Sequence, residues 1–280
     1  MGGDHGPAVV VEGAATAVRE FGASVILVGD RDAIEREVAR LDGGKLDIEI
    51  RHASQVVGMA ETPSVALRRK RDSSLRIAAE LVRDGHASAF ISAGNTGAAM
   101  AIAMFVIGVL RGIDRPAIAA VLPSLKRYTV LLDVGANVAP KPWHLFQYAL
   151  MGHVYARGIL GVERPRVGLL SVGEEEGKGN DLTKEAYDQL KESSLNFVGN
   201  VEGRDIYNGS CDVVVTDGFT GNVALKISES LAEMLGAMIK EELTRDVRSK
   251  LGAALAMPAF GRFRKRVDYT EMGGAPPISV

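Results

Sequence analysis

The segment Asp212–Lys226, DVVVTDGFTGNVALK, contains the pattern that decides the expected fold. The β-branched run Val213–Val215 is typical of a buried strand. Asp and Gly residues directly after it predict a tight turn, and the apolar residues beyond Asn222 recur at helical spacing. A strand that passes through a short glycine-rich turn into a helix is the βα unit of a parallel sheet.

The same alternation continues along the chain. We expect strands at Ser24–Val28, Asp47–His52, Ser88–Ser92, Ala117–Leu122, Thr129–Asp133, Arg166–Val172, Asn196–Gly199 and Asp212–Thr216. We expect helices at Asp32–Leu41, from Pro63, and at Ser73–Arg83, Thr96–Leu110, Pro142–Leu160, Leu182–Glu192 and Asn222–Leu243. The pattern predicts an α/β fold on a mostly parallel sheet, which we interpret as a single domain over residues 1–280 that includes a helical tip at 243–266.

The bulk properties exclude several classes of protein. The 280 residues are 46% apolar and 24% charged, which is ordinary globular composition and argues against disorder. The net charge of −2 creates no overall attraction to nucleic acid. The single cysteine, Cys211, rules out a disulfide framework and favours a reducing, cytoplasmic compartment. The longest apolar stretch, Ala98–Leu110, is too short to span a bilayer.

The two ends of the sequence suggest a shortened chain. Met1–Pro7 is a glycine-rich loop of the kind that follows a strand, yet no strand precedes it. The segment Gly273–Pro277 stops where another element is expected to begin. We therefore expect the domain to be truncated at both ends.

Glycine-rich loops follow several of the expected strands, at the edge where open parallel sheets bind ligands. SAGNTG at Ser92–Gly97, DVGAN at Asp133–Asn137 and TDGFTGN at Thr216–Asn222 each combine glycine with Asn or Thr. Tight turns use these residues for steric reasons, but free N–H groups at a helix start also bind anions. The loops together predict a phosphate or oxyanion site that contains Asn95, Thr96, Gly97, Asp133, Gly135, Asn137 and Gly221.

A further loop, GEEEGKGN at Gly173–Asn180, is the most polar of the chain. Spacing alone is equally consistent with a solvated acidic surface loop. The alternative centres on Lys178, because flanking glycines allow its ammonium group to approach a bound anion closely. The sequence has neither a P-loop nor a dinucleotide fingerprint, and its five histidines lack metal-ligand spacing, so we predict no metal and no cofactor.

At these loops the sequence resembles the PlsX phosphate acyltransferases. The matching blocks, in order, are MGGDHGP, SAGNTGA, GIDRPA, LLDVGAN, SVGEEEGKGN and VVTDGFTGNVALK, and the likeness runs from Met1 to about Ala275. The resemblance implies a homodimeric three-layer α/β/α sandwich akin to phosphotransacetylases and isopropylmalate-type dehydrogenases. It also implies a reaction in which an acyl thioester of acyl carrier protein and inorganic phosphate give acyl phosphate, which a glycerophosphate acyltransferase consumes in bacterial phospholipid synthesis.

The same resemblance implies Lys178 and Asn222 as the catalytic pair. Lys178 would either hold phosphate electrostatically or form a transient acyl-lysine, and the sequence leaves both open. Asn222 would polarise the thioester carbonyl.

The region after Glu242 changes in character. Apolar residues that include Leu251, Leu255 and Phe260 recur along it, and the basic residues Arg262, Arg264 and Lys265 follow. This pattern fits a core or dimer-packing helix as well as a peripheral contact with an anionic membrane surface, which the family resemblance favours. The basic cluster is also a candidate surface for the acidic carrier protein.

Three other functions compete with the main interpretation. A phosphotransacetylase-like enzyme would use acyl-CoA as its donor. A dehydrogenase of the related superfamily is disfavoured by the missing nucleotide fingerprint. A non-catalytic membrane-associated scaffold is disfavoured by the presence of Lys178 and the Gly-Asn loops.

Overall fold

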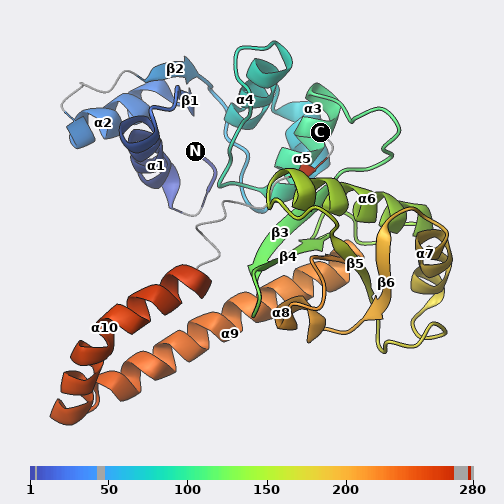
Figure 1. Ribbon diagram of the computed structural model, residues 1–280. Coiled ribbons are helices and arrows are strands. Elements are labelled where there is room, and N and C mark those ends of the chain that lie inside the picture. Colours follow the sequence, from blue (N-terminus) through green and yellow to red (C-terminus); the bar gives the residue numbers. More distant parts are fainter. Residues whose placement is uncertain (4, 43–47, 268–276, 279–280) are drawn as a thin grey trace. The chain divides into compact units, whose positions relative to one another are not determined.

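The computed structural model describes residues 1–3, 5–42, 48–267 and 277–278 (Figure 1). The chain divides after Leu110 into two compact units. This division does not test the prediction of one functional domain or of truncated ends, and both stay predictions. The segment Gly273–Pro276 lies outside the described residues.

The first unit contains a short parallel sheet and five helices. Its strands are β1 (Ile26–Gly29) and β2 (Glu49–His52), and its helices are α1 (Gly6–Phe21), α2 (Arg31–Asp42), α3 (Pro63–Arg69), α4 (Ser74–Arg83) and α5 (Thr96–Val106). Val11, Leu27 and Ile34 form one buried cluster, in which α1 and α2 pack against the sheet. Ala66, Ala79 and Ile102 belong to a second cluster between α3, α4 and α5.

Three predictions for this unit were wrong. The predicted loop Met1–Pro7 is shorter than expected, because helix α1 already begins at Gly6. Pro7 lies in the first turn of this helix, where its missing N–H costs no hydrogen bond. Ser88–Ser92 forms no strand, since Phe90 alone packs on the core and Ile91 is 96% exposed. Helix α5 ends at Val106 instead of Leu110, and Gly108 adopts a φ of +99° just beyond it.

The second unit is built on a six-stranded sheet. The strands are β3 (Ala117–Pro123), β4 (Tyr128–Leu132), β5 (Arg166–Leu170), β6 (Asn196–Val201), β7 (Val213–Val215) and β8 (Pro277–Ile278), in the order β6-β5-β7-β4-β3-β8. Neighbours from β6 to β4 are parallel, whereas β3 runs antiparallel to both β4 and β8. The α/β fold with a mostly parallel sheet is therefore confirmed.

Both faces of the sheet are buried at the central strands β4 and β7, as their apolar sequences require. On one face, Val130 and Val213 lie in the main core with Leu145 and Tyr148 of α6 (Pro142–Gly158) and with residues of α7 (Asp181–Lys191). Val214 points to the opposite face and is also fully buried. The short α8 (Asp205–Asn208) and the long α9 (Gly218–Thr244) also contact β4.

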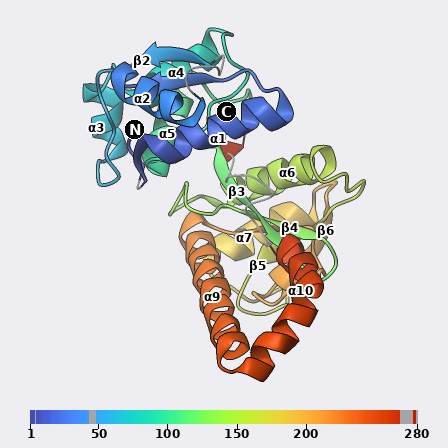
Figure 2. The same cartoon turned by 90° about the vertical axis from the view of Figure 1, so that its left-hand side faces the viewer.

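Helices α9 (Gly218–Thr244) and α10 (Val247–Val267) form a hairpin that projects from the sheet (Figures 1 and 2). Past its first turn α9 carries exposed apolar side chains, including Ile227, Leu231, Met234 and Met238. Leu251 and Leu255 of α10 are exposed and Phe260 is half-buried. Among the described helices, none is both long enough and apolar enough to cross a bilayer.

Candidate active site

The sheet order brings distant loops together at one edge. Strands β5, β7 and β4 are parallel neighbours, so the loops after them leave the sheet at the same edge. These loops are Gly173–Asn180, Thr216–Asn222 and Asp133–Asn137, and they carry Lys178, Asn222 and Gly135. A Cβ at Gly135 would lie 3.6 Å from Cγ of Asn222, so the Asn222 side chain lies against the loop that follows β4.

Asp133 organises the loop after β4 from within the core. Its Oδ1 accepts hydrogen bonds from the backbone N–H groups of Ile118 and Ala136, each at 3.0 Å. Its Oδ2 accepts one from the Asn137 N–H at 2.7 Å and one from Asn137 Nδ2 at 3.2 Å. Burial raises the pKa of this carboxyl, and the hydrogen bonds oppose the shift. Asp133 is fully buried and therefore shapes the loop from below rather than contacting a bound anion.

Asn137 joins this loop to the start of α9. Its Nδ2 also donates to the Pro116 carbonyl at 2.9 Å, and its own carbonyl accepts from the Gly218 N–H at 2.9 Å. Glycine is required at Gly221, because a Cβ there would lie 1.9 Å from the carbonyl oxygen of Asp133. Asn137 and Gly221 thus hold two loops in contact.

The N–H groups in the first turn of α9 are already occupied. The Asp217 side chain accepts from the N–H groups of Phe219 at 3.0 Å and Thr220 at 2.9 Å, and its carbonyl accepts from Gly221 at 2.9 Å. The N–H of Gly221, expected from the sequence to face an anion, is therefore not free. The Asn222 side chain is exposed and makes no hydrogen bond within the described structure, so its amide is available to a ligand.

Lys178 lies in the loop between β5 and α7 and is exposed. The aliphatic part of its side chain lies over Gly173, where a Cβ would come within 3.2 Å of Lys178 Cγ. On its other side, Gly179 has a φ of +106°, a backbone conformation that favours glycine. Gly173 therefore leaves room for the aliphatic part of the Lys178 side chain, and Gly179 allows the backbone to turn directly after Lys178.

The acidic residues of this loop have basic partners of their own. Glu174 forms an ion pair with Arg204 at 2.8 Å, and Glu176 forms one with Lys191 at 2.5 Å. Lys178 forms no ion pair within the part of the chain that the structure describes. Its ammonium group is consequently available to an anion, although the loop carries three glutamates.

Asn95 caps α5 in the first unit. Its Oδ1 accepts from the Ala98 N–H at 3.0 Å, and its Nδ2 donates to the carbonyls of Gly58, Met59 and Glu61 at 3.2, 3.0 and 2.8 Å. These bonds occupy the whole amide, so Asn95 shapes its own loop. Thr96 and Gly97 are exposed in the first turn of α5, and their anion-binding role stays a prediction.

Comparisons with known proteins identify the family of the chain. A family model described as "Fatty acid synthesis protein" matches residues 1–279. The curated "Phosphate acyltransferase" of Geotalea uraniireducens is 55% identical over 280 residues, which are 100% of this chain and 81% of that protein. The same-named protein of Nitratidesulfovibrio vulgaris is 56% identical over 281 residues, with coverage of 100% and 81%. The chain belongs to this phosphate acyltransferase family.

Solved structures place the fold among the phosphotransacetylases. A phosphotransacetylase from Streptococcus pyogenes superimposes with a TM-score of 0.58 at 18% identity, covering 81% of this chain and 79% of that one. The EutD phosphotransacetylase from Staphylococcus aureus gives 0.56 at 16% identity, covering 81% of each chain. The likeness concerns the fold, and it confirms the α/β class predicted from the sequence.

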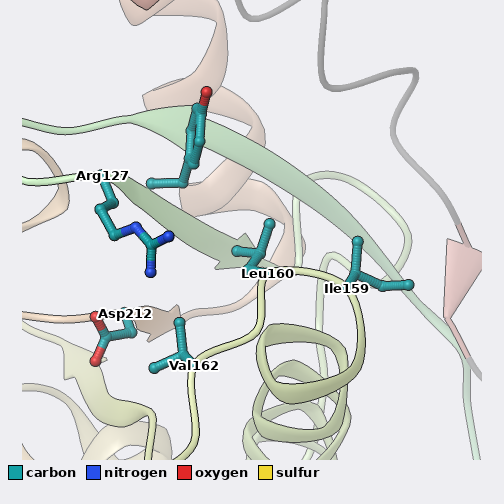
Figure 3. Close-up of a pocket in the computed structure, with 6 residues that line it drawn as sticks. Arg127, Ile159, Leu160, Val162 and Asp212 are labelled. Atoms are coloured by element: carbon teal, nitrogen blue, oxygen red, sulfur yellow. The ribbon is translucent and has the colours of Figure 1, made fainter.

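Figure 3 shows a hollow in the second unit that lies apart from the loops that carry Lys178, Asn222 and Gly135. It is lined by Arg127, Tyr128, Ile159, Leu160, Val162 and Asp212. Tyr128 begins β4 and Asp212 precedes β7, so this hollow opens at the amino ends of the strands. It contains none of the predicted site residues. No group of three or more potential metal ligands occurs among the described residues.

Asn200 is a buried residue near Lys178 that the sequence did not predict to belong to the site. The predicted strand ended at Gly199, whereas β6 continues to Val201 and buries the Asn200 side chain. Its Nδ2 donates to the Glu175 carbonyl at 2.9 Å, within the loop that carries Lys178. In the sequence, Asn200 directly follows Gly199, and a Gly-Asn pair at the end of an expected strand is typical of a turn. This local pattern therefore gave no sign that Asn200 is buried in the strand.

Proposed function

We propose that this protein transfers the acyl group of an acyl-carrier-protein thioester to inorganic phosphate and releases acyl phosphate. The family assignment over residues 1–279 carries this proposal, since it makes the chain a phosphate acyltransferase of lipid synthesis. The carrier protein as donor, the catalytic residues and the partners are the parts that we propose. No cofactor is needed, because a phosphate oxygen attacks the thioester carbonyl directly.

In this reaction a P–O–C bond forms, the C–S bond breaks and the thiolate leaves with the carrier. Lys178 neutralises the attacking phosphate, and the Asn222 amide donates a hydrogen bond to the oxyanion that develops on the carbonyl. Their loops follow neighbouring strands, and neither side chain has a hydrogen-bond or ion-pair partner among the residues that the structure describes, which supports these roles. The acyl-lysine route through Lys178 remains the second mechanism to test.

Fewer residues are proposed to contact phosphate than the sequence predicted. Gly135 and Asn222 meet at the candidate site, and Gly135 leaves room there for a ligand. Asp133, Asn137 and Gly221 act as supports, since their polar groups or close contacts lie within the protein. In the first unit, Asn95 supports its own loop through its occupied amide, and anion binding by Thr96 and Gly97 is proposed from the sequence alone.

An acyl-transfer assay tests the proposed donor. Purified protein is incubated with phosphate and a long-chain acyl group on either carrier protein or CoA, and acyl phosphate is trapped with hydroxylamine. We expect phosphate-dependent product from the carrier donor. Product mainly from CoA would favour the phosphotransacetylase-like alternative, and no product from either donor in folded protein would favour the scaffold.

We also propose that the protein works in the cytoplasm as a homodimer at the inner face of the cell membrane. The exposed apolar residues along α9 support pairing with a second copy. The exposed Leu251, Leu255 and Arg262 of α10 support contact with an anionic membrane surface, where a glycerophosphate acyltransferase would receive the product. Arg264 and Lys265 continue α10, but their side chains lie outside the described part of the structure.

A further inference from the structure

The loop that carries Lys178 rests on polar side chains at the end of the sheet. In the β5–β6 ladder Leu169 pairs with Asn200, and just beyond it the Ser171 N–H donates to the Val201 carbonyl at 2.8 Å. Alternation along the strands places Leu169, Ser171 and Asn200 on the same face of the sheet. Leu169 belongs to the main core on that face, so the two polar side chains lie between this core and the loop.

A single carbonyl oxygen links Asn200 to Lys178. The Glu175 carbonyl accepts one hydrogen bond from Asn200 Nδ2 at 2.9 Å and another from the Lys178 N–H at 3.0 Å. Asn200 is 4% exposed and lies on a strand, so its side chain has little freedom to move. The backbone of Lys178 is therefore joined to the sheet through two consecutive hydrogen bonds.

The loop also lies close to the end of the sheet at Gly179, the residue after Lys178. A Cβ at Gly179 would lie 2.9 Å from Oγ of Ser171 and 2.1 Å from Oγ1 of Thr183. These contacts and the positive φ of Gly179 allow the chain to pass directly over Ser171. Asn200 and Ser171 thus support the loop on the two sides of Lys178.

The chemistry of Asn200 indicates why an amide stands at this buried position. Its Oδ1 is buried without a hydrogen-bond partner among the described atoms, which is an unfavourable arrangement for a carbonyl oxygen. An apolar residue in its place would avoid that cost but could not donate to Glu175. The amide is best explained by its donor function toward the loop.

We infer that Asn200 is a positioning residue, which acts through the Glu175 carbonyl to hold Lys178 in its reactive place. This inference rests on the proposed role of Lys178 in acyl transfer. Asn200 does not touch the reacting atoms. Its removal is therefore expected to lower turnover by displacing Lys178, and to leave the Asn222 amide unaffected.

The test compares Asn200→Ala with Asn196→Ala in the full chain. Asn196 lies at the opposite end of the same strand, and its Nδ2 donates to the Arg164 carbonyl at 3.3 Å, so it is a matched control. With the carrier donor, we expect kcat to fall about tenfold to a hundredfold in Asn200→Ala and to change less than about twofold in the control. Hydrogen exchange of the segment 173–180 is expected to accelerate in Asn200→Ala alone. Asn200→Leu, which keeps the side-chain volume without the donor, serves if the alanine variant fails to fold.

The Lys178→Ala background separates positioning from a general structural role. We expect Asn200→Ala to cause no further loss of residual turnover there, because the group that it positions is absent. Unchanged kcat in both Asn200 variants, or a loss of kcat without faster exchange of the loop, would overturn the inference. If wild-type protein makes no acyl phosphate, the proposed function fails instead, and the exchange measurement still shows whether Asn200 holds the loop.

Discussion

The side chain of Asn222 lies against Gly135, where a Cβ would come within 3.6 Å of Asn222 Cγ. The two residues are far apart in sequence, and they meet because β4 and β7 are parallel neighbours. Gly135 also has a φ of +133°. The conformation of this glycine therefore determines the space beside the amide that we propose as oxyanion donor.

Gly135→Ala is expected to reduce both stability and turnover. The added Cβ meets an unfavourable backbone conformation, which costs on the order of 1–3 kcal/mol, and it touches the Asn222 side chain. Urea denaturation and acyl-transfer kinetics measure the two effects. Gly13→Ala is the control, since Gly13 lies within α1 with no atom near its would-be Cβ, and it should be neutral or stabilising.

Removal of either proposed catalytic side chain should abolish most activity without unfolding the protein. Loss of one oxyanion donor lowers turnover on the order of a hundredfold or more, and we expect this for both Lys178→Ala and Asn222→Ala. Lys184→Ala, an exposed lysine of α7, and Ser230→Ala, an exposed serine of α9, are the controls. Near-normal turnover of both catalytic variants in folded protein would refute the assignment.

Lys178→Arg distinguishes the two mechanisms that the sequence left open. Arginine keeps the positive charge but cannot form the acyl-amide intermediate of a lysine nucleophile. Partial activity with phosphate is expected if Lys178 acts electrostatically. Activity as low as that of Lys178→Ala, together with an acylated Lys178 detected by mass spectrometry in the wild type, would establish the covalent route.

Asp133→Asn should destabilise the protein by roughly 2–3 kcal/mol. The carboxylate accepts four hydrogen bonds, and an amide in its place would turn N–H groups toward some of the same donors. The urea midpoint of unfolding measures the loss. Asp188→Asn, at an exposed position of α7, should change it little. Equal midpoints for the two variants would show that Asp133 does not hold the loop.

The ion pair between Arg166 and Asp212 should contribute to stability only above the acidic range. Burial alone would raise the pKa of Asp212, but hydrogen bonds from the side chain and backbone of Arg166 outweigh it and leave the pKa below its ordinary value of 3.8. A lowered folded-state pKa means that the stabilisation is fully present above 3.8 and is lost as pH falls through the folded-state pKa.

Asp212→Asn therefore tests this pH dependence. At about pH 7 we expect the variant to be less stable by about 1–2 kcal/mol, because Arg166 is partly exposed and solvent screens the pair. The difference should shrink steadily in urea titrations carried out below about pH 4. A difference that stays constant down to the most acid pH would contradict the assigned shift.

Leu255→Glu should weaken binding to vesicles that contain anionic lipid. Leu255 is 86% exposed on α10, and a carboxylate there opposes both insertion and the surface charge. Flotation measures the bound fraction, and Val198→Glu, on β6, controls for the added charge. If the wild type does not float, or if both variants float equally well, the proposed membrane contact is wrong.

Local signals were sufficient for most of the second unit. The runs Ala117–Leu122 and Thr129–Asp133 identified β3 and β4 within one residue at either end, because buried apolar runs next to glycine turns have few other structures open to them. The same signals failed at Ser88–Ser92, where a short apolar run packs through Phe90 without forming a ladder. Helix α1 was missed because the glycines before it resemble a ligand-binding loop.

The sequence by itself determined the α/β class, the loops that bear Lys178 and Asn222, and the family, because these depend on the order of residues within short segments. Only the tertiary structure decided which polar residues remain available to a ligand. Asp133, Asn137 and Asn95 appear in the loops as plausible binding groups, yet each is occupied by backbone partners that folding supplies. Folding likewise supplied the hydrogen bond from Asn200 to the Glu175 carbonyl, in the loop that carries Lys178. A hydrogen bond from one strand to the loop that follows its neighbour depends on the order of the strands, and local sequence does not contain that order.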